Sequence, residues 1–193
     1  MEQQAETLSV KERLKNYFKL YKLGTRDIAY NAIIAALYVA LTYAFYWCSY
    51  GMIQFRISEF LIILVFFNPN YIYGLTIGCA LANIYSVTMG LTPLDILFGS
   101  MATLISCLLM SPMKHLFIAT LIPCLANGLI VGAELTFLMG GNGAFFYVNF
   151  GWVFLGEFVV ISIFGYILFL ALMKKNKAFP KLINAKRNLA LVF

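Results

Sequence analysis

Charged and amide side chains interrupt segments that are otherwise apolar, and they are the residues whose types could do chemistry. The candidate binding residues are Arg56, Glu59, Asn83, Asp95, Asn127, Glu134, Asn149 and Glu157. Carboxylates accept hydrogen bonds and attract cations, while asparagine amides offer a donor and an acceptor side by side to planar polar groups. We therefore expect these side chains to converge on a small polar ligand.

The segments that carry them have the composition of a membrane protein. Of the 193 residues, 62% are apolar and only 11% are charged, so most of the chain cannot form a water-soluble domain. Long apolar stretches separated by short turns are typical of spanning helices, and the strict alternation that a barrel needs is absent. An ionised side chain facing lipid costs on the order of 3 kcal/mol, so the acids must face one another or an aqueous cavity.

Turn residues divide the chain into six predicted membrane spans. The spans are roughly 27–49, 53–67, 71–89, 94–110, 116–139 and 145–173. The second is short and the sixth is long, so we expect one of them to begin with irregular backbone buried against its neighbours. The predicted fold is an all-α bundle of six transmembrane helices in the cell membrane.

The basic residues indicate the orientation. Of the 14 Lys and Arg residues, six precede the first span and six follow the last, which predicts that both termini are cytoplasmic. The predicted organisation is a basic N-terminal segment over 1–26, a membrane domain over 27–173 and a basic tail over 174–193. We expect the flanks to lie against anionic lipid, and not to bind nucleic acid, because they lack interleaved aromatic residues.

In this topology five spans send polar groups towards the outer half of the membrane. Arg56 and Glu59 are spaced to neutralise each other on one helical face, either as a purely structural pair or as part of the site. The other three acids have no second base within the spans, so the site carries net negative charge that a cationic ligand would balance. A planar heterocycle with amide-like edges would also suit these side chains.

Sequence motifs for catalysis are absent. The chain has no phosphate-binding loop, no HExxH and no GxSxG, so we predict a binding protein and not an enzyme. Its four cysteines are dispersed through apolar segments and its single histidine is His115, so we expect no metal and no cofactor.

Two rows of small residues could admit a neighbouring helix. The first span carries Ala32, Ala36, Ala40 and Ala44 at four-residue spacing, and the third carries Gly74, Gly78 and Ala82. Such rows allow close helix approach, either by a partner protein or by a helix of the same bundle.

Several segments together resemble the QueT family, which comprises substrate-binding S-components of energy-coupling factor (ECF) transporters. The similar segments are "AIIAALYVALTYAF", "IQFRISEFLIILVFFNP", "GLTIGCALANI" and "GLTPLDILFGSMATLIS". The resemblance runs through nearly all of residues 27–173, and QFRISE and LDxxFGS are its most specific parts.

The resemblance implies a six-helix S-component that captures a micronutrient outside the cell and joins a transmembrane T-component and two ATPase subunits. It implies that Ala32, Ala36 and Ala40 contact the T-component. The implied substrates are queuosine precursors, 7-deazaguanine derivatives such as queuine, 7-aminomethyl-7-deazaguanine or the nucleoside.

Roles for the candidate residues follow as hypotheses from the resemblance. The four acids would neutralise the ligand's amine or accept hydrogen bonds from its ring, and Asn83, Asn127 and Asn149 would bind its polar edge. Arg56 would orient Glu59 or donate to a ligand carbonyl. Tyr147 and Trp152 would either stack on the ring or anchor the helix at the membrane interface.

Two alternatives stay open. The chain could be an S-component for another small vitamin-like heterocycle. It could instead be a proton-coupled secondary transporter, which would use the same carboxylates, although no internal repeat is detectable in the six spans.

Overall fold

The computed structural model describes most of the predicted membrane domain and part of the basic tail. The described residues are 23–49, 55–88, 90, 92–137, 141–176 and 178–186. The basic N-terminal segment up to residue 22 and the tail after residue 186 lie outside these ranges. Within them all regular secondary structure is helical, without β-strands, which confirms the predicted all-α class.

Each predicted span overlaps one or more described helices, although the first span is divided near Phe45 and a further short helix follows the sixth. The helices are α3 (Thr25–Ala44), α4 (Tyr46–Ser49), η1 (Ile57–Ile62), α5 (Ile63–Phe67), α6 (Tyr71–Thr88), α7 (Leu94–Met110), α8 (Leu116–Phe137), α9 (Gly143–Glu157), η2 (Phe158–Gly165), α10 (Tyr166–Lys175) and α11 (Phe179–Leu182). Three helices in the described residues are long and apolar enough to cross a membrane, namely α3, α8 and the continuous helix from α9 to α10.

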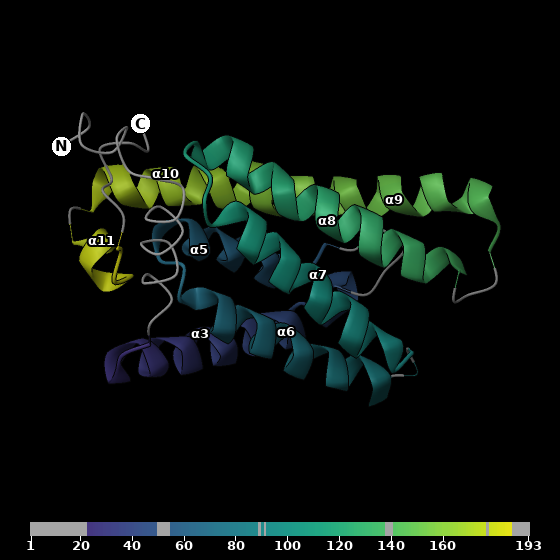
Figure 1. Cartoon of the computed structure of the whole chain (residues 1–193), viewed down its shortest axis with the longest axis horizontal. Helices are drawn as coiled ribbons and strands as arrows, with labels where there is room; N and C mark the ends of the chain where they lie inside the picture. The colour runs from purple at the N-terminus through teal and green to yellow at the C-terminus, as the bar shows by residue number, and fades with distance from the viewer. Residues whose placement is uncertain are drawn as a thin grey trace, which may run out of the picture.

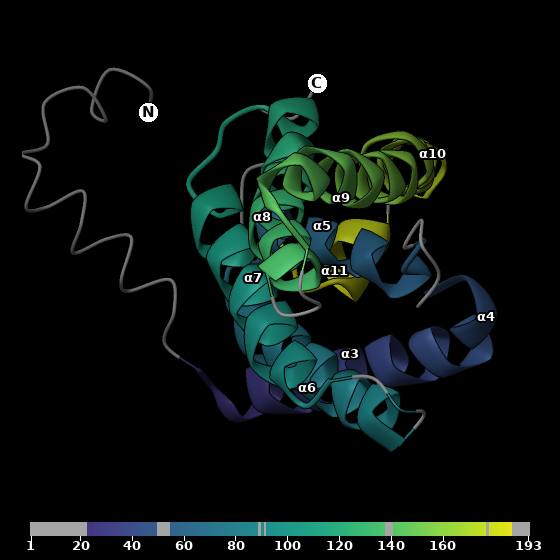
Figure 2. The same ribbon diagram turned by 90° about the vertical axis from the view of Figure 1, so that its right-hand side faces the viewer.

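Four pairs of helices pack side by side along the bundle (Figure 1). Helix α3 lies on α6, α6 on α7, α7 on α8, and α8 on α9. The segment η1–α5 lies among them and contacts both α3 and η2, so it fills the interior of the bundle (Figure 2). A helix with neighbours on every side has no need of a polar face, which explains the five apolar residues of α5.

Two of the helical segments depart from α-helical geometry. The second predicted segment opens with the 3₁₀ turns of η1, and the sixth contains the π-helical stretch η2. The π-helix is rare and recurs at functional sites. The short second segment is therefore the one that begins with irregular backbone, and it is buried against its neighbours.

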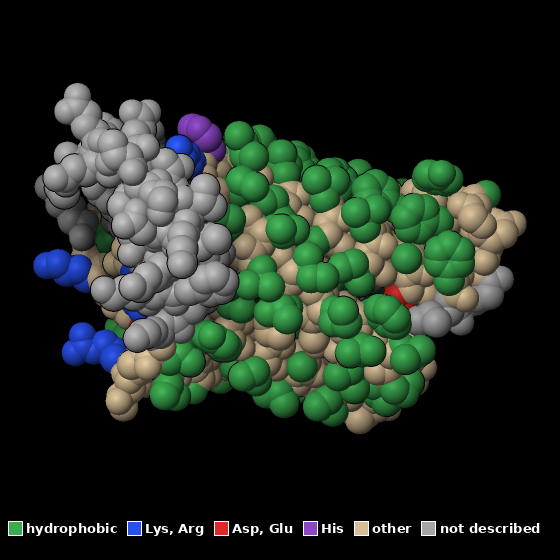
Figure 3. All heavy atoms as spheres, viewed as in Figure 1, with side chains coloured by type: hydrophobic (Ala, Val, Ile, Leu, Met, Phe, Trp, Pro, Cys, Tyr) green, Lys and Arg blue, Asp and Glu red, His purple; other side chains and the backbone are tan. Residues whose placement is uncertain are grey.

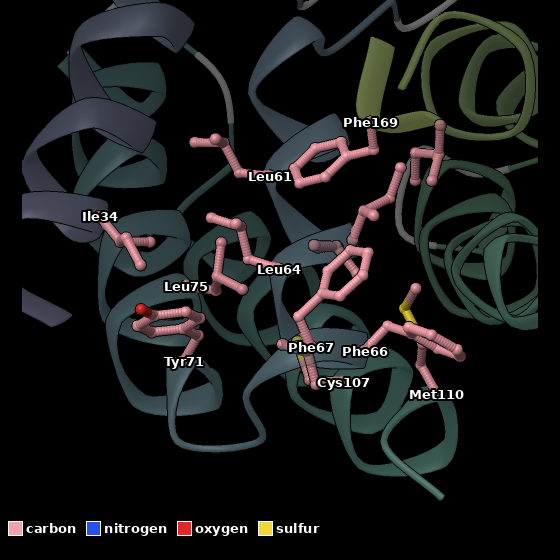
Figure 4. Close-up of a cluster of buried hydrophobic side chains, with 14 of the residues drawn as sticks. Ile34, Leu61, Leu64, Phe66, Phe67, Tyr71, Leu75, Cys107, Met110 and Phe169 are labelled. Carbon is pink, nitrogen blue, oxygen red and sulfur yellow. The ribbon is translucent and has the colours of Figure 1, made fainter. Parts of the chain in front are cut away.

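Apolar packing fixes α5 in place (Figure 4). Phe66 and Phe67 are almost fully buried, and the ring of Phe67 stacks on Phe169 of α10 with centroids 5.8 Å apart. Leu75 of α6 and Met110 of α7 join the same core. Because α5 continues η1, this core also holds the first turn of η1, where the charged residues lie.

Polar contacts tie the two ends of the described chain together near the start of α3. The Asp27 carboxylate accepts hydrogen bonds from Gly24 N at 3.0 Å, Asn184 Nδ2 at 3.0 Å and Lys186 Nζ at 3.1 Å. Lysine and arginine side chains gather at this end of the molecule, while apolar side chains cover the remaining length of the visible face (Figure 3). We call this region the basic end.

The two rows of small residues have different surroundings. Gly74 and Gly78 are buried against α3, and a Cβ on Gly74 would lie 2.5 Å from the carbonyl oxygen of Asn31. That row therefore serves packing within the bundle. Residues Ala32, Ala36 and Ala40 are exposed on the outer face of α3, so no helix in the described part of the chain covers them.

Candidate functional site

The turn at the start of η1 positions the first two charged residues. Arg56 Nη1 lies 3.8 Å from Glu59 Oε1, with side-chain exposures of 7% and 1%. The hydroxyl of Tyr38, on α3, donates a hydrogen bond to the same carboxylate oxygen. Arg56 Nη1 also lies 3.7 Å from the sulfur of Cys79 on α6. The predicted pair exists, and it is linked to two further helices.

Helices α6 and α7 supply the next part of the site. Asn83 is fully buried, and its amide nitrogen donates to the backbone oxygen of Asp95 at 3.0 Å. A Cβ on Gly99 would lie 2.5 Å from that nitrogen. Only glycine at this position therefore leaves room for the Asn83 side chain. Asp95, in the first turn of α7, is 8% exposed.

A hydrogen bond between α8 and α9 supplies another part. Asn127 Nδ2 donates to Glu157 Oε1 at 2.9 Å, with both residues at most 5% exposed. Both helices are irregular nearby, because Pro123 lies inside α8 and η2 begins directly after Glu157. Proline removes a helical hydrogen bond, and a π-helix shifts the residues that face the interior. This region therefore combines a buried polar pair with a distorted backbone.

Glu134 completes the set. It is 5% exposed, and it lies close enough to Asp95 and Arg56 to interact electrostatically with both. Glu157 interacts in the same way with Glu59 and Arg56. The structure thus joins residues from five helical segments into one interior acid cluster, comprising Arg56, Glu59, Asn83, Asp95, Asn127, Glu134 and Glu157.

Several carboxylate oxygens of the cluster lack a hydrogen-bond partner among the described residues. They are Oε2 of Glu59, Oε2 of Glu157 and both side-chain oxygens of Glu134. Buried polar atoms in proteins are nearly always hydrogen-bonded, and leaving one without a partner costs about 1–3 kcal/mol. A ligand with several N–H donors would supply the missing hydrogen bonds.

One predicted site residue lies apart from the cluster. Asn149 is only partly buried, and its amide nitrogen donates to Thr136 Oγ1 at 2.8 Å, which links α9 to α8. Tyr147 and Trp152, on the same helix, are 75% and 40% exposed. Such exposure fits the interfacial-anchor hypothesis and not stacking on a ligand in the interior.

Sequence reasoning missed Tyr38 and the polar role of Cys79. Tyr38 lies seven residues after Asn31 and four before Thr42, and all three are buried on the face of α3 that packs inside the bundle. Polar residues recurring at helical spacing opposite the alanine row would have indicated this face. Cys79 is one of the cysteines dispersed through apolar segments, yet its sulfur lies 3.7 Å from both Arg56 Nη1 and Asn83 Nδ2.

The arrangement defines a helical membrane protein whose interior holds a cluster of buried acidic and amide side chains. Within the described ranges, no group of three or more His, Cys, Asp or Glu side chains could hold a metal ion.

The chain belongs to the QueT transporter family, whose sequence profile matches residues 28–174. Members of this family are transporters, and the long apolar helices of the chain fit a multi-pass protein of the cell membrane. It is similar to the Queuosine precursor transporter QueT of Lactococcus lactis subsp. cremoris (strain MG1363), with 45% identity over 86 residues. The aligned region covers 44% of this chain and about half, 48%, of that relative. No solved structure is significantly similar to the chain.

Proposed function

We propose that the chain is the substrate-binding S-component of an ECF-type transporter and that it imports a queuosine precursor of the 7-deazaguanine class. The observation that carries the proposal is the interior acid cluster, with its unpartnered carboxylate oxygens, inside a member of the QueT transporter family. A 7-deazaguanine offers ring and exocyclic N–H groups to these acceptors, and an amine substituent would balance the excess of acids over the one arginine.

The proposed topology has six membrane spans with both termini in the cytoplasm. The described lysines support it, since Lys114 lies between α7 and α8, Lys174 lies in the last turn of α10, and Lys186 pairs with Asp27. Lysine and arginine side chains gather at one end of the molecule (Figure 3). The interior acid cluster then lies in the outer half of the membrane, where a substrate arrives from outside. The proposed organisation keeps the basic flanks 1–26 and 174–193 in the cytoplasm, around a membrane domain over 27–173.

The proposed partners are a transmembrane T-component and two ATPase subunits. The exposed alanine row supports a docking role, because Ala32, Ala36 and Ala40 present small side chains along two turns of the outer face of α3. The opposite face of the same helix carries Tyr38, which donates to Glu59. Helix α3 therefore lies between the proposed partner surface and the proposed ligand site.

Ligand titration of the purified full-length protein tests the proposal. We expect submicromolar binding of queuine or 7-aminomethyl-7-deazaguanine, and weaker binding by the Glu59→Gln variant. Asp27→Asn is the matched control, because it also neutralises a buried acid but lies at the basic end. An S-component for another heterocycle would bind neither compound, which would contradict the assigned substrate class.

A proton-coupled transporter is the second candidate, because Glu134 has two buried oxygens without described partners and such carboxylates also carry protons. Uptake into liposomes distinguishes the two functions. Transport by this chain alone that an uncoupler abolishes would favour proton coupling. Transport that requires ATP and the partner subunits would favour the S-component.

A further inference from the structure

We propose that the interior acid cluster contains two subsites with different selectivity: Glu134 binds the ligand's ammonium group, and Glu157, held by Asn127, binds an N–H edge of its ring. This division deepens the proposed function and rests on it, because it assigns two parts of one ligand to two parts of the same site.

Glu134 has the surroundings of an ammonium site. It is 5% exposed, and neither of its carboxylate oxygens has a described hydrogen-bond partner. The nearby charged groups with which it interacts are Asp95 and Arg56. Because Arg56 is already in an ion pair with Glu59, it cannot fully compensate the remaining acids. An ammonium group has three rotatable donors and can satisfy both oxygens without a strict directional requirement.

Glu157 has the surroundings of a directional acceptor. Its Oε1 accepts from Asn127 Nδ2 at 2.9 Å, and its Oε2 has no described partner. The Asn127 hydrogen bond fixes the orientation of the carboxylate, so Oε2 can select an N–H group that points from a rigid ring. The N–H group of a rigid ring also has a fixed direction, whereas an ammonium group on a rotatable arm does not.

The spacing of the two subsites fits one ligand. Asn127 and Glu134 lie on the same helix, α8, seven residues apart. That separation is close to two turns, so both side chains project from one face, about 10.5 Å apart along the helix axis. A bicyclic ring with a one-carbon amine arm, plus a hydrogen bond at each end, can bridge such a distance.

Two ligands, two site variants and one control variant test the division. The ligands are 7-aminomethyl-7-deazaguanine and its 7-nitrile analogue, which keeps the ring but cannot carry the positive charge. We expect wild type to bind the amine about 30-fold more tightly or better, the scale of a charge-assisted hydrogen bond. Glu134→Gln should weaken binding of the amine about 10- to 100-fold and leave the nitrile within about threefold. Glu157→Gln should weaken both ligands by similar factors, and Asp27→Asn should weaken neither.

Melting temperatures of the ligand-free proteins distinguish a lost ligand contact from misfolding of the variant. Because Glu134 has no described partner to lose, Glu134→Gln should melt at a temperature equal to or above that of ligand-free wild type. Weak amine binding by a variant of undiminished stability would therefore report a lost ligand contact.

The contradicting outcomes are distinct. Equal wild-type affinity for the amine and the nitrile would overturn the ammonium subsite and leave the proposed function intact. A preference for the amine that survives Glu134→Gln, or that disappears in Glu157→Gln, would overturn the assignment of the two residues. Failure of wild type to bind any 7-deazaguanine would overturn the proposed function itself, and the division with it.

Discussion

Asp27 and Glu134 are two buried acids in the same bundle, with exposures of 8% and 5%, yet their surroundings are opposite. Asp27 at the basic end accepts hydrogen bonds from Gly24, Asn184 and Lys186. Glu134 in the interior acid cluster has no described partner for either oxygen. Burial alone therefore does not identify a functional acid. The two acids differ in the hydrogen-bond partners that each has among the described residues.

The same contrast holds for the residues around each acid. At the basic end, Asn31 Oδ1 accepts from Gly74 N at 2.6 Å, and Tyr71 donates to the carbonyl of Ile183 at 2.6 Å. The first contact joins α3 to α6, and the second holds the segment around Ile183 against α6. In the cluster, carboxylate oxygens of Glu59, Glu134 and Glu157 are buried without a hydrogen-bond partner among the described residues. The carboxylate oxygens of Asp27 are hydrogen-bonded within the described chain, whereas those of Glu134 are not.

Adding a side chain at Gly74, where α6 lies closest to α3, should give the largest effect on stability. A Cβ on Gly74 would lie 2.5 Å from Asn31 O, so we expect Gly74→Val to cost on the order of 3 kcal/mol by forcing α3 and α6 apart. Thermal unfolding in detergent measures it. Gly151→Ala is the control, because a Cβ there meets nothing within 4 Å, and it should be neutral or slightly stabilising. Equal melting temperatures for the two variants would contradict the close packing of α3 on α6.

Neutralising the satisfied acid should destabilise the protein without affecting its ligand. Asp27→Asn removes the ion pair with Lys186 at 3.1 Å and weakens two further hydrogen bonds, so we expect a loss of about 1–2 kcal/mol. Binding affinity should stay within about twofold of wild type, a change of roughly 0.4 kcal/mol. A large loss of affinity would show that the basic end and the cluster are energetically coupled.

Neutralising Glu134, the acid without described hydrogen-bond partners, should stabilise the protein instead of destabilising it. We expect Glu134→Gln to raise the free energy of unfolding by about 1 kcal/mol, because an amide is less costly than a carboxylate to bury without partners. Melting temperatures of the ligand-free proteins measure the difference. A destabilisation as large as that of Asp27→Asn would mean that Glu134 has a structural partner after all.

The exposed alanine row should give the smallest effect on stability. Ala36→Leu adds bulk on an outer face, so we expect stability within about 0.5 kcal/mol of wild type. Assembly with the T-component and ATPases should nevertheless fail, as measured by co-purification. Ile33→Leu, at an exposed position of α3 outside the row, is the control and should assemble normally. Normal assembly of Ala36→Leu would remove the row from the proposed partner surface.

Hydropathy and the cost of burying charge were enough to predict the helices and most of the cluster. Apolar length predicted where α6, α7 and α8 lie, and the need to shield the acids from lipid predicted that Glu59, Glu134 and Glu157 would converge. Both predictions depend on the composition of long segments, and they do not require the conformation of any single residue.

Details that depend on distant partners could not be predicted. Asp27 gains its partners from Asn184 and Lys186, which lie more than 150 residues further along the chain. The hydrogen bond of Asn149 to Thr136 depends on how α9 packs on α8, which no single segment reveals. The π-helical geometry after Glu157 likewise depends on packing, because its sequence reads simply as an apolar helix.

The most direct test compares ligand-induced stabilisation in wild type, Asp27→Asn and Glu134→Gln, with 7-aminomethyl-7-deazaguanine at 100 times the wild-type Kd. Wild type should gain about 2.7 kcal/mol, and Asp27→Asn should start from a lower stability and gain as much. Glu134→Gln should start at or above wild type and, with affinity reduced 100-fold, gain only about 0.4 kcal/mol. If Glu134→Gln gains as much as wild type, the unsatisfied carboxylate is not a ligand contact and the central claim is contradicted.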